Sequence, residues 1–250
     1  EADPEIGRPG LSDEPAPRPN PEHRPRSGGG RFASRRQPHA ENGIDLDRYA
    51  PSVGRAELRQ RLGLDPDRRY VANIARFHPV KDQATLLRAF ADVVRQREDV
   101  DLLLVGDGPL RGALEQQARS LGIDHRVRFM GVRDDVPAIL QAIDVFVLTS
   151  VSEAASITLL EAMASGVPAV VTAVGGNPEI VRHDIEGLLV PRADSDAAAA
   201  AIIELLANPS RAAAMGTAGA RRIREHYRMS ATVDAYSAMY PHFEERLAAS

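Results

Sequence analysis

The amino-acid sequence predicts a doubly wound α/β domain built on a parallel sheet, and two patterns carry this prediction. From about residue 41 onward, short apolar runs of strand length alternate five or six times with stretches of helical periodicity, an order that favours a parallel sheet flanked by helices. The runs are nearly continuous in apolar residues, as expected for strands that are covered on both faces. The expected strands are Tyr70–Ala75, Val100–Val105, Val127–Met130, Val145–Leu148, Ala169–Thr172 and Gly187–Val190.

Helical stretches fill the connections between these runs and close the chain. Two helix starts are recognisable, since Pro109 suits the first turn of one helix and Asp134–Asp135 can cap the next. Three further helices are expected after the last strand. The expected helices are Gln83–Arg97, Pro109–Leu121, Val136–Ala142, Ile157–Ser165 and Pro178–Val181, followed by Ser195–Leu206, Pro209–Glu225 and Ser230–Leu247.

The first 40 residues differ in composition from the rest of the chain. They hold eight of the 18 prolines, the Gly28–Gly30 run and almost no large apolar side chains. Such a segment cannot bury enough surface to offset its loss of chain entropy. We therefore expect residues 1–40 to be disordered or an extended linker, and residues 41–250 to form the domain. A second interpretation is that residues 1–40 were translated across a damaged gene start. Because the chain begins with Glu1 and not with Met, it is also open to interpretation as a fragment of a longer protein.

The bulk composition excludes several classes of protein. The formal net charge is −4 with acidic and basic residues intermixed, so we expect no nucleic-acid partner. The absence of cysteine excludes disulfides and thiolate metal sites and suits a reducing compartment, so we expect a cytoplasmic protein. No apolar run reaches the roughly 18 residues of a membrane span, which leaves at most peripheral membrane association.

The connection after the first expected strand carries two cations. Arg76 follows that strand and Lys81 opens the next helix, and Lys81 is the only lysine among 31 basic residues. A lysine in the first turn of a helix opposes the helix dipole unless an anion binds there. Ligands of open parallel sheets lie at the carboxyl ends of the strands. We therefore interpret the two cations as a diphosphate site and not as ordinary surface charges.

Two carboxylates eight residues apart follow the fourth expected strand. Glu153 lies in the loop and Glu161 on the next helix, among apolar residues that indicate burial. A buried glutamate needs a partner, and both side chains could bind sugar hydroxyls through charge-assisted hydrogen bonds. The other interpretation is a solvated pair on a helix surface. The amides that open this helix can bind phosphate oxygens, and they belong to Ala155, Ser156 and Ile157.

Glycines occupy two further connections, Gly106–Pro109 and Gly175–Gly176. Glycine allows the backbone to turn tightly or to approach another group closely. In both loops the sequence leaves two interpretations open. Either the backbone approaches a ligand, or the glycines only make the turn.

Taken in order, the motifs of the chain resemble those of one large family. This is the family of retaining glycosyltransferases that includes sucrose, glycogen and mannosyl transferases, known as group 1 or family 4, with two facing Rossmann-like domains in the GT-B fold. The resemblance covers residues 41–250 and corresponds to the C-terminal, donor-binding domain. The motifs that carry it are Asn42–Asp45, Arg76 to Lys81, Gly106–Pro109, Val127–Gly131, Glu153 to Glu161, Gly175 to Glu179 and Gly187–Pro191.

The resemblance implies a transfer of a hexose from a nucleotide-sugar donor to a glycan, lipid or small-molecule acceptor, with retention of configuration and without a metal ion or cofactor. UDP is the first choice of nucleotide and GDP the second. Arg76 and Lys81 would bind the diphosphate, Glu153 the transferred sugar and Glu161 the ribose hydroxyls, while Gly131 and Val132 would lie against the base. Arg76, Lys81 and Glu153 would be the catalytic residues, with the charge of the leaving phosphate stabilised by cations and amides.

Two departures from the family pattern limit these implications. Ala154–Ser156 replaces the Gly-Phe-Gly that many members carry, which keeps the backbone amides but leaves sugar specificity open. The expected amino-terminal domain, which would bind the acceptor, is also missing. The chain is then either a truncated transferase, a transferase completed by a second chain, or a remnant that binds a nucleotide-sugar without transferring it. A nucleotide-sugar epimerase of similar architecture fits the Glu153 to Glu161 spacing less well.

Overall fold

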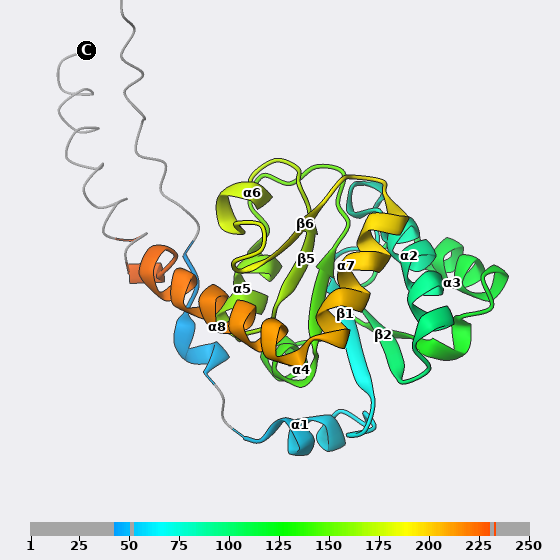
Figure 1. The fold of residues 1–250 in the computed structure, drawn as a ribbon, viewed down its shortest axis with the longest axis horizontal. Helices are drawn as coiled ribbons and strands as arrows, with labels where there is room; N and C mark the ends of the chain where they lie inside the picture. The colour runs from blue at the N-terminus through cyan, green and yellow to red at the C-terminus, as the bar shows by residue number, and fades with distance from the viewer. Residues whose placement is uncertain (1–42, 51–52, 231–232, 234–250) are drawn as a thin grey trace, which may run out of the picture. The chain divides into compact units, whose positions relative to one another are not determined.

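The structure is a computed structural model that describes residues 43–50, 53–230 and 233. It contains a parallel six-stranded sheet with helices on both faces (Figure 1), in the order β3-β2-β1-β4-β5-β6. The predicted doubly wound parallel fold is therefore confirmed, and each strand falls within one residue of its expected bounds. The strands are β1 (Arg69–Ile74), β2 (Val100–Val105), β3 (Val127–Gly131), β4 (Val145–Leu148), β5 (Ala169–Thr172) and β6 (Gly187–Val190).

The described helices include elements that the sequence did not predict. The unexpected α1 (Arg55–Arg61) has only Leu58 and Arg59 buried, so its apolar periodicity is too short to recognise. Three short 3-10 helices were also not predicted: η1 (Leu46–Tyr49), η2 (Pro79–Lys81) and η3 (Asp124–Arg126). The others are α2 (Gln83–Gln96), α3 (Arg111–Ser120), α4 (Val136–Ala142), α5 (Ile157–Ala164), α6 (Asn177–Ile180), α7 (Ser195–Ala207) and α8 (Pro209–His226).

Some expectations lie outside the described residues. These are the expected disorder of residues 1–40 and most of the expected closing helix Ser230–Leu247.

One expected helix start is wrong, and one expected capping hydrogen bond does not form. Helix α3 begins at Arg111 and not at Pro109, because the preceding turn is bonded to the loop after β1, where the Leu110 N–H donates to the Phe77 carbonyl at 3.3 Å. Asp135 precedes α4 but makes no side-chain capping hydrogen bond. Its carboxylate instead accepts from the guanidinium of Arg133 at 2.6 and 2.8 Å.

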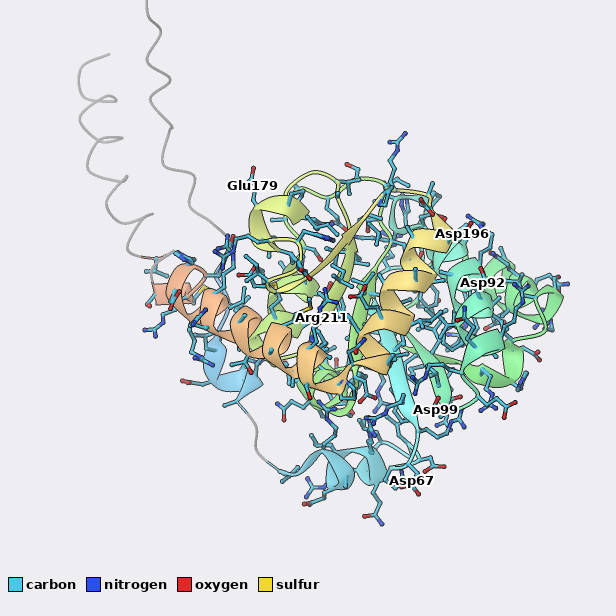
Figure 2. The ribbon with its side chains drawn as sticks, viewed as in Figure 1. Asp67, Asp92, Asp99, Glu179, Asp196 and Arg211 are labelled. Carbon is cyan, nitrogen blue, oxygen red and sulfur yellow. The ribbon has the colours of Figure 1, made fainter. Side chains whose placement is uncertain are left out.

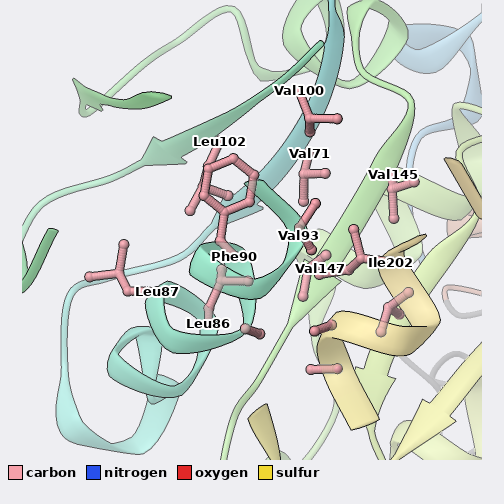
Figure 3. Close-up of a cluster of buried hydrophobic side chains, with 14 of the residues drawn as sticks. Val71, Leu86, Leu87, Phe90, Val93, Val100, Leu102, Val145, Val147 and Ile202 are labelled. Atoms are coloured by element: carbon pink, nitrogen blue, oxygen red, sulfur yellow. The ribbon is translucent and has the colours of Figure 1, made fainter. Parts of the chain in front are cut away.

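Apolar side chains cover both faces of the sheet, and each strand alternates between two cores. Helices α2 and α7 cover one face (Figure 3) together with α3, and α1, α4 and α5 cover the other, while α8 contributes to both cores. Burying apolar surface stabilises a fold by about 25 cal/mol per Å², so the two cores hold the strand ends, and the loops that leave them, in place. The first core contains Val71, Val100, Leu102, Val145 and Val147 of the strands, Leu86, Leu87, Phe90 and Val93 of α2, and Ile202 of α7.

Charged side chains lie on the outer surfaces of the helices (Figure 2). Glu179, Asp196 and Arg211 are exposed on α6, α7 and α8, and Arg211 pairs with Asp184 and Glu204. Among the residues that the structure describes, no helix has the length and hydrophobicity needed to cross a membrane.

Candidate functional site

The switch point of the sheet lies between β1 and β4, where the order of the strands reverses. Ligands of open α/β sheets bind outside the carboxyl ends of the strands at this point. The two connections that leave these strands contact each other there. The Val151 N–H donates to the Val80 carbonyl at 2.9 Å, and the Thr149 hydroxyl donates to the Asp82 carbonyl at 2.9 Å. The structure thus brings together two motifs that lie more than 60 residues apart.

The connection after β1 carries Arg76 and Lys81. Arg76 is exposed, its carbonyl accepts from the Gln83 amide at 3.0 Å, and its guanidinium pairs with no carboxylate among the described residues. Lys81 does not open α2, as the sequence predicted, but ends the 3-10 helix η2. The left-handed Asp82, at φ 44°, separates the two helices and caps α2 through Thr85.

Glu153 lies buried in the connection after β4 and contacts Lys81. Its Oε1 accepts from the Lys81 ammonium at 2.5 Å and from the Ser150 hydroxyl at 2.6 Å. The side chains of Lys81 and Glu153 are 24% and 7% exposed. The sequence singled out both charges but predicted neither their pairing nor the part played by Ser150.

The glycines after β5 fix the backbone of Glu153. At Gly175, where φ is 52°, an added Cβ would lie 1.6 Å from the Glu153 carbonyl oxygen, and at Gly176 it would lie 2.2 Å from that of Ala154. The Gly176 N–H donates to the Glu153 carbonyl at 3.1 Å. The close approach that these glycines allow is therefore to the loop of Glu153.

The Gly106–Pro109 loop packs in the same way on the loop that carries Arg76. An added Cβ would lie 2.2 Å from the Ala75 carbonyl oxygen at Gly106, and 2.4 Å from that of Phe77 at Gly108. The Phe77 N–H also donates to the Asp107 carbonyl at 2.9 Å. Packing between loops therefore accounts for both pairs of glycines, and this is neither of the two interpretations that the sequence left open.

Glu161 lies one turn into α5, half-buried, and accepts a hydrogen bond from the Tyr49 hydroxyl at 2.5 Å. Burial, and then the Glu161 carboxylate, raise the pKa of Tyr49 well above its ordinary value, so the phenol remains a donor at neutral pH. Tyr49 was not foreseen, because it lies 112 residues before its partner.

The amino end of α5 faces the same edge of the sheet as Glu153. Ser156 caps the helix through the Leu159 N–H at 3.3 Å, and Ile157 is exposed. In the described part of the chain, the amides of Ala155, Ser156 and Ile157 donate no hydrogen bond. They remain available to an anion at the positive end of the helix dipole.

Gly131 and Val132 lie farther along the same edge, at the end of β3. The Gly131 carbonyl accepts from the Gly106 N–H at 2.8 Å, and Val132 is 77% exposed. Strand β2 separates β3 from β1, so these two residues lie to one side of the switch point. An exposed valine beside a glycine offers an apolar surface on which a flat ring can stack.

Cations, free amides and carboxylates thus meet at one edge of the sheet, the combination suited to an anionic ligand that also carries hydroxyl groups. Among the described residues, no group of three or more His, Asp and Glu side chains is arranged to hold a metal ion. The order of the strands and the helices on both faces define a doubly wound α/β domain of the GT-B type.

The chain belongs to the family of glycosyl transferases group 1, whose model matches residues 54–222. It is 39% identical over 204 residues to a GDP-mannose-dependent alpha-(1-6)-phosphatidylinositol monomannoside mannosyltransferase of Mycolicibacterium smegmatis, covering 76% of this chain and 53% of that protein. It is 34% identical over 184 residues to the N-acetyl-alpha-D-glucosaminyl L-malate synthase of Bacillus anthracis, covering 74% of this chain and 48% of that one.

Solved structures show the same relationship. The HepE protein of Anabaena, in complex with UDP and glucose, superposes with a TM-score of 0.73 at 27% identity, over 81% of this chain and 55% of that one. A sucrose-phosphate synthase of Thermosynechococcus elongatus superposes with a TM-score of 0.73 at 32% identity, over 84% and 52% of the two chains. The chain spans about half the length of the relatives that it matches.

Proposed function

We propose that this chain is the donor-binding half of a retaining glycosyltransferase that transfers a hexose from a nucleotide-sugar. One observation carries the proposal. Lys81 from the β1 connection and Glu153 from the β4 connection meet at the switch point, which is where an open α/β sheet binds its ligand. The names of the relatives support the same class of reaction.

Each part of the donor has a counterpart along this edge. The diphosphate would bind Arg76, Lys81 and the amides of α5. Arg76 is exposed and these amides donate no hydrogen bond within the described residues, whereas Lys81 is paired with Glu153. Glu161 would bind the ribose hydroxyls and Glu153 the sugar, while the base would stack on Gly131 and Val132. As the bond to the sugar breaks, the cations and amides would stabilise the charge on the leaving diphosphate, without a metal ion or cofactor.

We place UDP first and GDP second as the nucleotide. The HepE structure contains UDP, and the mycobacterial relative is named for GDP-mannose. A glycan, lipid or small molecule would be the acceptor, bound by an amino-terminal domain or by a second chain. We place the protein in the cytoplasm, with at most peripheral membrane association.

A protein that binds a nucleotide-sugar without transferring it is the second candidate, since each contact proposed for this domain is with the donor. Positioning of the reacting groups can be worth about 7–11 kcal/mol of the barrier, and one half of a GT-B enzyme positions only the donor. We therefore expect the chain to bind a nucleoside diphosphate but to transfer sugar very poorly. Sustained sugar transfer by the purified monomeric chain would contradict this.

Calorimetric titration of Lys81→Ala with UDP, or with GDP if it binds better, tests the diphosphate assignment. A charge-assisted contact is worth about 1.5–3 kcal/mol, so affinity should fall roughly tenfold to hundredfold. Arg221→Ala, which removes an exposed cation of α8, is the matched control and should bind like the parent chain. If Lys81→Ala also binds like the parent, the assignment is wrong.

Glu161→Ala tests the ribose assignment with a pair of ligands. The variant should bind UDP more weakly than the parent chain does, but should bind 2′,3′-dideoxy-UDP equally well, because that ligand has no hydroxyls for the carboxylate. Equal weakening of both ligands would instead assign Glu161 a structural role in α5.

A further inference from the structure

We propose that Lys81 and Glu153 form an ion pair that the donor must open, so that sugar recognition depends on the arrival of the diphosphate. The inference rests on the proposed function. The diphosphate would draw the Lys81 ammonium away from Glu153, and the carboxylate would then be free to accept hydrogen bonds from hydroxyls of the sugar. Each charge would bind its own part of the donor only after leaving the other.

The two residues of the ion pair differ in how many other contacts hold them, and Glu153 is the one held in place. Ser150 donates to Glu153 Oε1 at 2.6 Å, and the Gly176 N–H holds the carbonyl of Glu153 at 3.1 Å. Glu153 Oε2 accepts no hydrogen bond within the described residues. When the ammonium leaves, the carboxylate therefore stays in position with an oxygen ready for a hydroxyl donor.

Lys81 is the side that can move. It ends a helix of three residues, its side chain is partly exposed, and Glu153 is its one side-chain partner in the described part of the chain. A lysine side chain is a compact charge on a flexible stem. A diphosphate carries more negative charge than a single carboxylate, so it can compete for the ammonium.

The exchange has a cost that the sugar can offset. Removing one partner of a buried ion pair leaves the other charge without compensation. A nucleoside diphosphate alone would bind the Lys81 ammonium and leave the Glu153 carboxylate buried without a counter-charge. A complete nucleotide-sugar would also supply hydroxyl groups that donate hydrogen bonds to this carboxylate. The pair therefore favours the complete donor over the free diphosphate.

Glu153→Gln separates this inference from a simple contact. The amide is similar in shape but no longer holds the ammonium by charge, so Lys81 is free before the ligand arrives. We expect affinity for UDP alone to rise about tenfold, the size of one charge-assisted contact, and the additional affinity for UDP-glucose over UDP to shrink. A glutamate that only touches the sugar would leave UDP binding unchanged.

The calorimetric experiment compares the full chain with Glu153→Gln, Lys81→Ala and the double variant. The gain in UDP affinity should largely disappear when Glu153→Gln is made in the Lys81→Ala background. A gain that persists undiminished there would reduce Glu153 to a repulsive charge near the phosphates and overturn the inference, as would no gain at all. Ser150→Ala is the control, because it removes the other donor to Oε1 and leaves the pair intact.

A second measurement follows Lys81 directly, and its part on the parent chain does not depend on whether the Glu153 variant folds. Lys81 is the chain's only lysine, so isotope-labelled lysine gives one set of side-chain NMR signals. Saturating UDP should shift the Lys81 signals of the parent chain, and those of Glu153→Gln should differ from the parent without UDP but coincide with it when UDP is bound. Lys81 signals that stay unchanged while UDP binds would overturn the inference.

The outcomes also separate this inference from the proposed function. If neither UDP nor GDP binds the parent chain, the proposed function fails. If the parent binds and Lys81→Ala weakens binding, but Glu153→Gln does not strengthen it, only the inference fails.

Discussion

The carboxylates of Asp144 and Glu153 lie at opposite ends of the parallel strands, and their hydrogen-bonding partners differ. The amino ends of the strands form the amino edge of the sheet, and the carboxyl ends form its carboxyl edge. At the amino edge, Asp144 accepts hydrogen bonds from the Tyr70 N–H at 2.8 Å and from the guanidinium groups of Arg59 at 2.7 Å, Arg55 at 3.1 Å and Arg69 at 3.2 Å. At the carboxyl edge, Glu153 has one lysine and one serine on a single oxygen.

The partner of each carboxylate is also held differently. The Arg59 side chain is 5% exposed and donates to the carbonyls of Ala142, Pro66 and Arg68 at 2.9–3.0 Å. It also lies over the ring of Tyr70, with its guanidinium carbon 5.1 Å from the centroid. Lys81 has no such set of bonds. A buried charge with four hydrogen bonds supports the fold, whereas a charge with one exchangeable partner can respond to a ligand.

Asp144→Asn should have the largest effect on stability, and it should disrupt the hydrogen bonds at the amino edge without changing the carboxyl edge. The substitution leaves the buried Arg59 guanidinium without its carboxylate, and removing one partner of a buried ion pair costs about 3–5 kcal/mol. We expect urea denaturation to show a loss of this size, with UDP affinity unchanged for the folded chain. The control is Asp92→Asn, on the surface pair with Arg95, which should cost less than about 1 kcal/mol. Equal stability of the two variants would contradict the comparison.

Tyr49→Phe should give a smaller effect, confined to the carboxyl edge. It keeps the ring and removes the hydroxyl that positions Glu161. A hydrogen bond contributes roughly 1 kcal/mol, so UDP affinity should fall about fivefold, while 2′,3′-dideoxy-UDP should bind as it does to the parent chain. A merely structural tyrosine would instead weaken both ligands alike, and calorimetry with the two ligands tells these outcomes apart.

Glu186→Gln should have the smallest effect on stability. Glu186 precedes β6 at the amino edge, so this variant tests a second buried carboxylate there. Burial opposes the charge of Glu186, but hydrogen bonds from the Arg182 guanidinium and N–H outweigh it and hold the pKa below the usual 4.5. A carboxylate with a lowered pKa stabilises the fold above pH 4.5, and this contribution is lost as pH falls through the folded pKa.

The measurement for Glu186 is the free energy of unfolding across acidic pH. The parent chain should lose stability more steeply than Glu186→Gln as the pH falls below the usual glutamate value. Identical slopes for the two proteins would show that Glu186 has no lowered pKa.

The sequence predicted the strands well because a strand buried on both faces must be apolar along its length, as in Val145–Leu148. It predicted α1 and η2 poorly, since each is shorter than the pattern by which a helix is recognised. The pairing of Lys81 with Glu153 spans 72 residues, and only the order of the strands brings the two together. Local sequence patterns can identify such residues as chemically unusual, but they do not show that the two side chains lie close together in the fold.

The parallel sheet has a consequence for how such a domain can change over time. Every connection that leaves a carboxyl end collects on one side, while the Arg59–Asp144 network lies on the other. The Ala154–Ser156 stretch lies on the first side and contributes only Ser156 to the buried residues. Substitutions there can alter what this side of the sheet binds while the core stays as it is, so selection can act on binding and on folding almost independently.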